Sequence, residues 1–166
     1  MLSNAAQILA ENSILKWDPR PEDCRSPVIA DLYRYWQQRR GQRRFPARAD
    51  LDPLAMKAAL GNISLIEVQR APLRFKLRLV GSYQAERLGL DPTGTWLDEL
   101  PTPEYRQLLI RRLEELVARP MPLLVHNRQL MDDKWYDYEA LWLPLAADGD
   151  TVDMVMACQV FADGAE

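Results

Sequence analysis

The fold is decided by residues 74–94, RFKLRLVGSYQAERLGLDPTG. The first part of this stretch alternates between apolar and charged side chains: Phe75, Leu77 and Leu79 against Arg74, Lys76 and Arg78. Such alternation is typical of a half-buried antiparallel strand. Ser82 then begins a short helix that Gly89 ends, and residues 91–94 form a turn. The stretch therefore predicts a strand, a helix and a tight turn in immediate succession.

The residues on either side extend this pattern into a sheet. Residues 62–69 are rich in strand-forming apolar residues and are joined to the alternating strand by a turn at 70–72, so the two form a hairpin. A longer helix begins at Thr102 and Pro103 and ends at Pro120. Three more strands follow, at residues 122–130, 135–145 and 151–161. This order predicts an α+β fold: a five-stranded antiparallel sheet with a helical insert between its second and third strands.

A flanking helix precedes the sheet. Ser26 and Pro27 are a strong helix start, and Gly41 can supply the left-handed stop. Apolar side chains follow helical spacing along one face: Ile29, Leu32, Tyr33 and Trp36. This stripe is the candidate interface of the chain. It is expected to pack either on the outer face of the sheet or across a two-fold homodimer.

A second, shorter helix is predicted to begin at residues 52–53, with Met56 and Leu60 inward and Gly61 at its end. The first 25 residues are less regular, and their apolar positions fit a short helix: Ala5, Ile8, Leu9 and Leu15. The chain therefore divides into an N-terminal extension, flanking helices, a core and a tail, at residues 1–25, 26–61, 62–162 and 163–166.

The core resembles the PAS domain. Residues 74–94 look like its second strand with the helix and turn that follow, and residues 131–161, MDDKWYDYEALWLPLAADGDTVDMVMACQVF, look like its last two strands. Residues 32–53, LYRYWQQRRGQRRFPARADLDP, are similar to the N-terminal motif of a family of small PAS-like proteins in alphaproteobacteria, which includes Pro46, Arg48, Asp50 and Pro53. The resemblance covers about residues 30–162 and implies a regulatory or sensory role.

The composition is that of an ordinary globular chain. A length of 166 residues with 48% hydrophobic and 27% charged residues suits one domain and excludes collagen, coiled coils and disulfide scaffolds. No stretch approaches the ~20 apolar residues that span a bilayer. The two cysteines, Cys24 and Cys158, fit a reducing compartment. We therefore expect a cytoplasmic protein without a membrane partner.

The charges are distributed unevenly. Residues 35–49 contain five arginines and no acid, whereas residues 131–166 carry nine acids and one lysine. Either each set covers a solvated face, or the two segments pair within or between chains. The net charge of −3 argues against nucleic acid as a partner. Arg39 and Arg43 have the Arg-x-x-x-Arg spacing of some nucleotide binders but lack the companion Asp-x-Ser-x-x-Gly motif, so the run is expected to contact acidic groups.

The resemblance raises several cofactor classes, and the residues argue against the common ones. A flavin-binding photosensor of this kind needs a cysteine in the helical insert, and residues 82–118 contain none. A haem-binding member usually takes a histidine from the insert, whereas the single histidine, His126, lies on the third predicted strand. No zinc spacing or catalytic pair involves His126 or the cysteines. We therefore expect that the protein is not an enzyme and holds no metal, and no cofactor is evident from the sequence. An unknown small molecule remains open as a ligand.

The core also holds the residues for a ligand pocket. The large apolar candidates are Phe75, Leu77, Trp96, Leu109, Trp142 and Met156, and the candidates for polar contacts are His126, Tyr138 and Gln159. Ligand sites are mainly apolar with a few convergent polar groups. The same side chains would also fill a solid core, and the sequence leaves both interpretations open.

Two functions fit these observations. The first is a bacterial PAS-type regulatory domain that binds a small ligand or a signalling partner, because the length leaves no room for an output domain of its own. The second is a ligand-free dimerisation or protein-interaction module. A homodimer is expected for both, since closed two-fold dimers are the commonest soluble assemblies.

Overall fold

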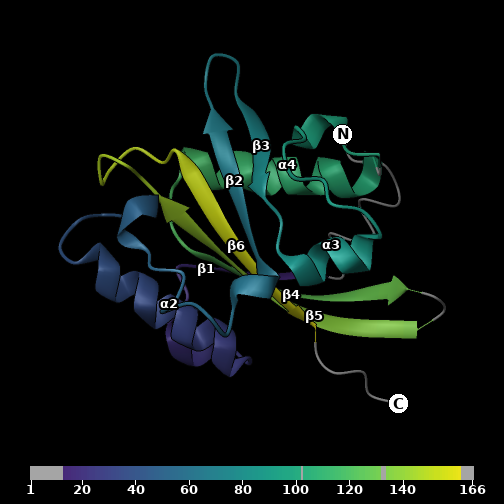
Figure 1. Cartoon of the computed structure of the whole chain (residues 1–166), viewed down its shortest axis with the longest axis horizontal. Helices are drawn as coiled ribbons and strands as arrows, with labels where there is room; N and C mark the ends of the chain where they lie inside the picture. The colour runs from purple at the N-terminus through teal and green to yellow at the C-terminus, as the bar shows by residue number, and fades with distance from the viewer. Residues whose placement is uncertain (1–12, 102, 132–133, 162–166) are drawn as a thin grey trace.

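The computed structural model describes residues 13–101, 103–131 and 134–161. Within them, one antiparallel sheet contains the strands β1 (Ser13–Trp17), β2 (Ile63–Gln69), β3 (Arg74–Leu79), β4 (Leu123–Met131), β5 (Lys134–Leu145) and β6 (Met154–Phe161). The helices are α2 (Pro27–Arg40), α3 (Ser82–Leu88) and α4 (Pro103–Ala118), and the short 3-10 turns are η1 (Pro21–Asp23), η2 (Arg48–Asp50), η3 (Leu60–Asn62) and η4 (Leu97–Glu99). Helix α2 lies on one side of the sheet, and α3 and α4 lie on the other (Figure 1).

The strands lie in the order β1-β4-β5-β6-β2-β3. The predicted α+β class and the helical insert, which runs from β3 to β4, are confirmed. The sheet has one strand more than predicted, because β1 pairs with β4 and places Leu15 beside Val125. Leu15 is therefore in a strand rather than in the predicted helix, and the other positions of that helix, Ala5, Ile8 and Leu9, lie outside the described residues.

Helix α2 begins and ends where its sequence predicts. The Ser26 hydroxyl accepts a hydrogen bond from the Ile29 N–H at 3.4 Å, and Gly41 ends the helix with a φ of 60°. Its apolar stripe, Ile29, Leu32, Tyr33 and Trp36, is at most 3% exposed and packs on β5 and β6. The Trp36 indole donates to the Pro144 carbonyl at 3.0 Å. The stripe therefore belongs to the core of one chain, where it packs on the sheet. This corrects its assignment as a contact between two copies, because packing on the sheet was the other predicted alternative.

The second flanking helix is replaced by a series of tight turns. Hydrogen bonds between residues three apart, such as Met56 N–H to Pro53 O at 3.1 Å and Ala59 N–H to Met56 O at 2.9 Å, lead into η3. These tighter turns change which residues face inward. Met56 is buried as predicted, but Ala59 is buried beside it and Leu60 is 39% exposed, so the prediction for Leu60 is wrong.

The two charged segments meet within the chain. Arg44 and Asp150 form an ion pair at 3.8 Å, and the Phe45 N–H donates to the Gly149 carbonyl at 3.1 Å. Gly149, with a φ of 82°, lies against the Arg43 side chain. Pairing of the basic and acidic segments, one of the two alternatives above, is therefore present at this turn. The contact fixes the segment before β2 against the end of β5.

Candidate functional site

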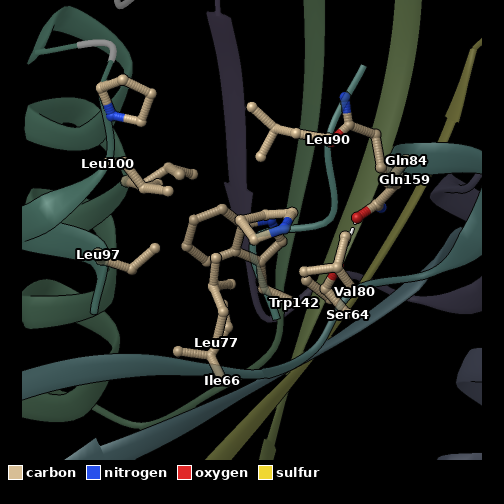
Figure 2. Close-up of a pocket in the computed structure, with 14 residues that line it drawn as sticks. Ser64, Ile66, Leu77, Val80, Gln84, Leu90, Leu97, Leu100, Trp142 and Gln159 are labelled. Atoms are coloured by element: carbon tan, nitrogen blue, oxygen red, sulfur yellow. Dashed lines mark hydrogen bonds between the residues drawn. The ribbon is translucent and has the colours of Figure 1, made fainter. Parts of the chain in front are cut away.

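A cavity of about 170 Å³ lies between the sheet and the helical insert (Figure 2). Its floor comes from β2, β3, β5 and β6, and its roof comes from α3, η4 and the first turns of α4. The residues that line it are Ser64, Ile66, Leu77, Val80, Gln84, Leu90, Pro92, Leu97, Leu100, Pro101, Leu109, Trp142, Ala157 and Gln159. The lining is mainly apolar, as is usual for sites that bind small organic molecules.

The floor is hollow because small side chains meet in the middle of the sheet. The strand register places Ala157 of β6 between Trp142 of β5 and Ser64 of β2. The methyl group of Ala157 and the hydroxymethyl group of Ser64 therefore lie beside the large indole of Trp142. Both groups are too short to fill the space above the sheet to the height of the indole ring. Trp142 is only 5% exposed, so its ring is a fixed wall of the cavity.

The roof is an apolar wall that is tied to β3. Leu97 is 1% exposed and lies with Leu100 on the side opposite the sheet's polar residues (Figure 2). The Leu77 N–H donates to the Thr95 carbonyl at 2.9 Å, which holds the segment before η4 against β3. Leu90 is 49% exposed and also lines the cavity, so the opening to solvent lies beside the connection between α3 and η4.

One side of the cavity is polar. The Ser64 hydroxyl donates to Gln84 Oε1, shown as a dashed line in Figure 2, and Gln84 Nε2 donates to the Asn62 carbonyl at 2.8 Å. These bonds fix the Gln84 amide between α3 and the start of β2. Gln159 of β6 lies on the same side, and its amide makes no hydrogen bond within the described part of the chain. The cavity thus combines an apolar body with one amide that is still available.

The structure brings only some of the predicted pocket residues to the cavity. Leu77, Leu109, Trp142 and the polar candidate Gln159 line the cavity. Phe75 is 3% exposed and belongs to the packed core outside the lining. Met156 is 1% exposed but neighbours Ala157, so alternation turns it to the other face of the sheet, where α2 packs.

Trp96 does not face the cavity, which corrects its prediction as a lining residue. It forms an isolated antiparallel bridge with Lys76, whose side chain points away from the face that carries Leu77. The Arg74 guanidinium lies 4.2 Å from the centre of the indole ring, and the Lys76 ammonium lies 5.4 Å from it. Leu97, the next residue, fills the position on the cavity side.

His126 and Tyr138 border a second hollow, of about 190 Å³, near the N-terminus of α2. His126 Nε2 pairs with the carboxylate of Glu139, which is 5% exposed. The same carboxylate accepts the N–H groups of Arg25 at 2.7 Å and Ser26 at 2.8 Å. The Tyr138 hydroxyl accepts from Asn127 Nδ2 at 2.7 Å. His126 is therefore part of a polar cluster that docks α2, and neither residue reaches the first cavity.

Sequence reasoning missed the lining residues Ser64, Gln84 and Ala157, and it also missed Glu139, the buried carboxylate of the second hollow. Glu139 interrupts the apolar run of β5, between Tyr138 and Ala140, and an acid in such a strand is a signal of a buried, bonded carboxylate. Its charge also acts on the two thiols. Burial, with a smaller contribution from Glu139, raises the pKa of Cys158 to about 12 and that of Cys24 to about 11. Both thiols are therefore held in the unreactive protonated form.

Among the described residues, no three His, Cys, Asp or Glu side chains come together in a way that would hold a metal ion. None of the helices in this part of the chain combines the length and the apolar character needed to cross a bilayer.

A sheet whose helical insert closes over an apolar cavity defines an α+β domain with a candidate ligand site. A family model described as a PAS domain matches residues 24–160. The chain therefore belongs to the PAS domain family, whose members are typically sensory rather than catalytic. The resemblance of the core to the PAS domain is thereby confirmed.

Two similar solved structures are light-oxygen-voltage proteins. One is a light-oxygen-voltage domain whose mechanism was studied with a flavin analogue: the identity is 14%, the TM-score is 0.47, and the match covers 66% of this chain and 83% of that chain. The other is an RNA-binding light-oxygen-voltage receptor: the identity is 15%, the TM-score is 0.40, and the match covers 68% of this chain and 33% of that chain. No curated protein sequence matches the chain.

Proposed function

We propose that this chain is a PAS-type regulatory domain that binds a small molecule in the cavity between its sheet and its helical insert. The observation that supports the proposal is the cavity itself: about 170 Å³ of space with an apolar lining and one polar side. A solid core of the same side chains would leave no such volume, because protein interiors are close-packed. An apolar concavity with a few convergent polar groups is the default ligand site of a domain.

The hollow near α2 is a weaker candidate for the ligand site. The oxygens of Glu139 already accept two backbone N–H groups and pair with His126. A ligand there would have to replace bonds that the chain makes to itself, whereas the first cavity offers the amide of Gln159 without such competition. The cluster around Glu139 is therefore better explained as the attachment of α2 to the sheet.

The signal is proposed to leave through the roof of the cavity. The floor belongs to a rigid six-stranded sheet, whereas the roof is held by individual bonds such as Gln84 to Asn62 and Leu77 to Thr95. A ligand that prefers one position of the roof shifts the population toward that position. The ring of Tyr83 on α3 is 58% exposed and lies against Gly61, so it would report such a shift on the surface. A second copy or a cytoplasmic signalling protein is proposed to read it.

Native mass spectrometry of the purified chain tests the proposal, together with thermal unfolding against a metabolite library. A bound small-molecule mass, or a ligand that raises the melting temperature, is the expected result. The variant Ala157→Leu should abolish binding without loss of stability, because its side chain extends into existing space. Ala118→Leu, at the exposed end of α4, is the matched control and should bind normally.

A ligand-free dimerisation or interaction module is the alternative function. An unliganded dimer whose stability no metabolite changes would support it and would refute the proposed ligand site.

A further inference from the structure

We infer that the cavity selects an uncharged, flat molecule with an apolar body and one edge that both donates and accepts hydrogen bonds. This inference rests on the proposed function and names the chemical class of its ligand. It follows from three features of the cavity: the charge of its lining, the bonding state of its polar groups and the shape of its walls.

Among the described residues that line the cavity, none has an ionisable side chain, and all are apolar apart from Ser64, Gln84 and Gln159. Burying an ion without a counter-charge costs far more than burying a neutral polar group. Arg112 of α4 is buried, but it does not line the cavity and its Nη2 donates to the Ser13 hydroxyl at 2.7 Å. A carboxylate or phosphate in the cavity would therefore find no cation among the described lining residues, so we expect the cavity to discriminate against anions.

The polar side determines where a ligand must carry its own polar groups. Gln84 is already committed, because its Oε1 accepts from Ser64 and its Nε2 donates to Asn62. Gln159 offers one carbonyl acceptor and an NH₂ donor, and neither has a partner within the described residues. A ligand edge with an acceptor beside a donor, such as an amide, a lactam or a ring N–H next to a carbonyl, satisfies both. Figure 2 shows the three polar side chains on the side opposite Leu97 and Leu100.

The walls determine size and shape. An apolar cavity of about 150 Å³ takes up benzene, so about 170 Å³ suits a compact ring rather than a long chain. The Trp142 indole is held in place by burial and presents an aromatic surface to the cavity. Aromatic rings pack favourably against each other in offset or edge-to-face geometry. A planar ring is therefore the body that this cavity fits best.

Three probes of nearly equal size test the inference: toluene, benzamide and benzoate, measured at neutral pH by thermal unfolding and calorimetry on the full chain. Toluene tests the apolar body, benzamide adds a neutral donor and acceptor, and benzoate replaces them by a negative charge. We expect benzamide to bind best, toluene to bind about tenfold more weakly, and benzoate to give no shift at the concentration that saturates benzamide.

The variant Gln159→Met isolates the polar edge while keeping the length of the side chain. It should weaken benzamide about tenfold and leave toluene unchanged, because only benzamide uses the amide. Gln38→Met, on the exposed face of α2, is the control and should change neither. An equal loss of both probes in Gln159→Met would show that the change acts on shape and would overturn the role of the amide.

Other outcomes separate this inference from the proposed function. Benzoate binding as tightly as benzamide, and lost in Ala157→Leu, would refute the neutral ligand class but support the cavity as a ligand site. If neither toluene nor benzamide binds, the inference about the ligand class is also overturned. The proposed function would then be decided by the native mass spectrum of the chain.

Discussion

The substitution Glu139→Gln should detach helix α2 from the sheet at its N-terminus. The buried carboxylate accepts two backbone N–H groups, of Arg25 at 2.7 Å and Ser26 at 2.8 Å, and pairs with His126. Glutamine keeps the size of the side chain but replaces one acceptor oxygen by an NH₂ group, which points a donor at a donor. Hydrogen bonds to a charged group contribute about 1.5–3 kcal/mol each, and a buried N–H left without a partner adds a further cost.

The expected loss of unfolding free energy is therefore about 3 kcal/mol. For a domain of this size, that corresponds to a fall in melting temperature of roughly 6–12 °C. Urea unfolding and calorimetry measure both values. Asp137→Asn is the control, because Asp137 lies two residues away on the same strand but is 58% exposed and pairs with an exposed Arg128. It should change stability by less than about 0.5 kcal/mol. Equal effects of the two variants would refute the assignment of Glu139 as the attachment point of α2.

The remaining predictions test other parts of the fold. Because burial raises the pKa of Cys158 to about 12 and that of Cys24 to about 11, neither thiol should react with a disulfide reagent at pH 8 before unfolding, and rapid labelling of the native chain would contradict this. Hydrogen bonds from a backbone N–H and a guanidinium lower the pKa of Asp50 below its ordinary 3.8. Its contribution to stability is therefore complete above that value and is lost as the pH falls through the folded pKa. Asp50→Asn should flatten the dependence of unfolding free energy on pH between about 5 and 2, and an unchanged slope would exclude this role. Gly81→Ala would place its Cβ against the backbone carbonyl of Gly61 and should lower the free energy of unfolding by about 2 kcal/mol, measured by urea unfolding. A variant as stable as the wild type would show that the backbones at Gly81 and Gly61 are not in close contact.

The elements with strong periodicity were predictable from the sequence. The alternation of Phe75 and Leu77 with charged residues predicted β3, and the stripe from Ile29 to Trp36 predicted α2. Both patterns report which face of an element is buried. They do not report what covers that face, so the choice between the sheet and a second copy for α2 required the tertiary structure. Strand β1 was missed because its pairing with β4 joins residues more than a hundred positions apart, and no local pattern records such a pairing.

The cavity was only partly predictable, for a related reason. Large apolar residues such as Trp142 and Leu109 were candidates because they must lie inside. The hollow itself depends on a small residue, Ala157, which the strand register places next to the indole. Trp96 was misplaced because the residue order through a turn does not determine which side of the sheet a side chain reaches. Its bridge with Lys76 determines that side.

Strand β5 connects the cavity to the flanking helix. Because side chains alternate along a strand, Trp142 faces the cavity, while Glu139 and Leu141 face the layer of α2. Glu139 and Trp142 are three residues apart, which is about 10 Å along the strand. The strand thus presents Trp142 to the cavity on one face, and on the other face it carries the carboxylate that accepts the two hydrogen bonds from the start of α2.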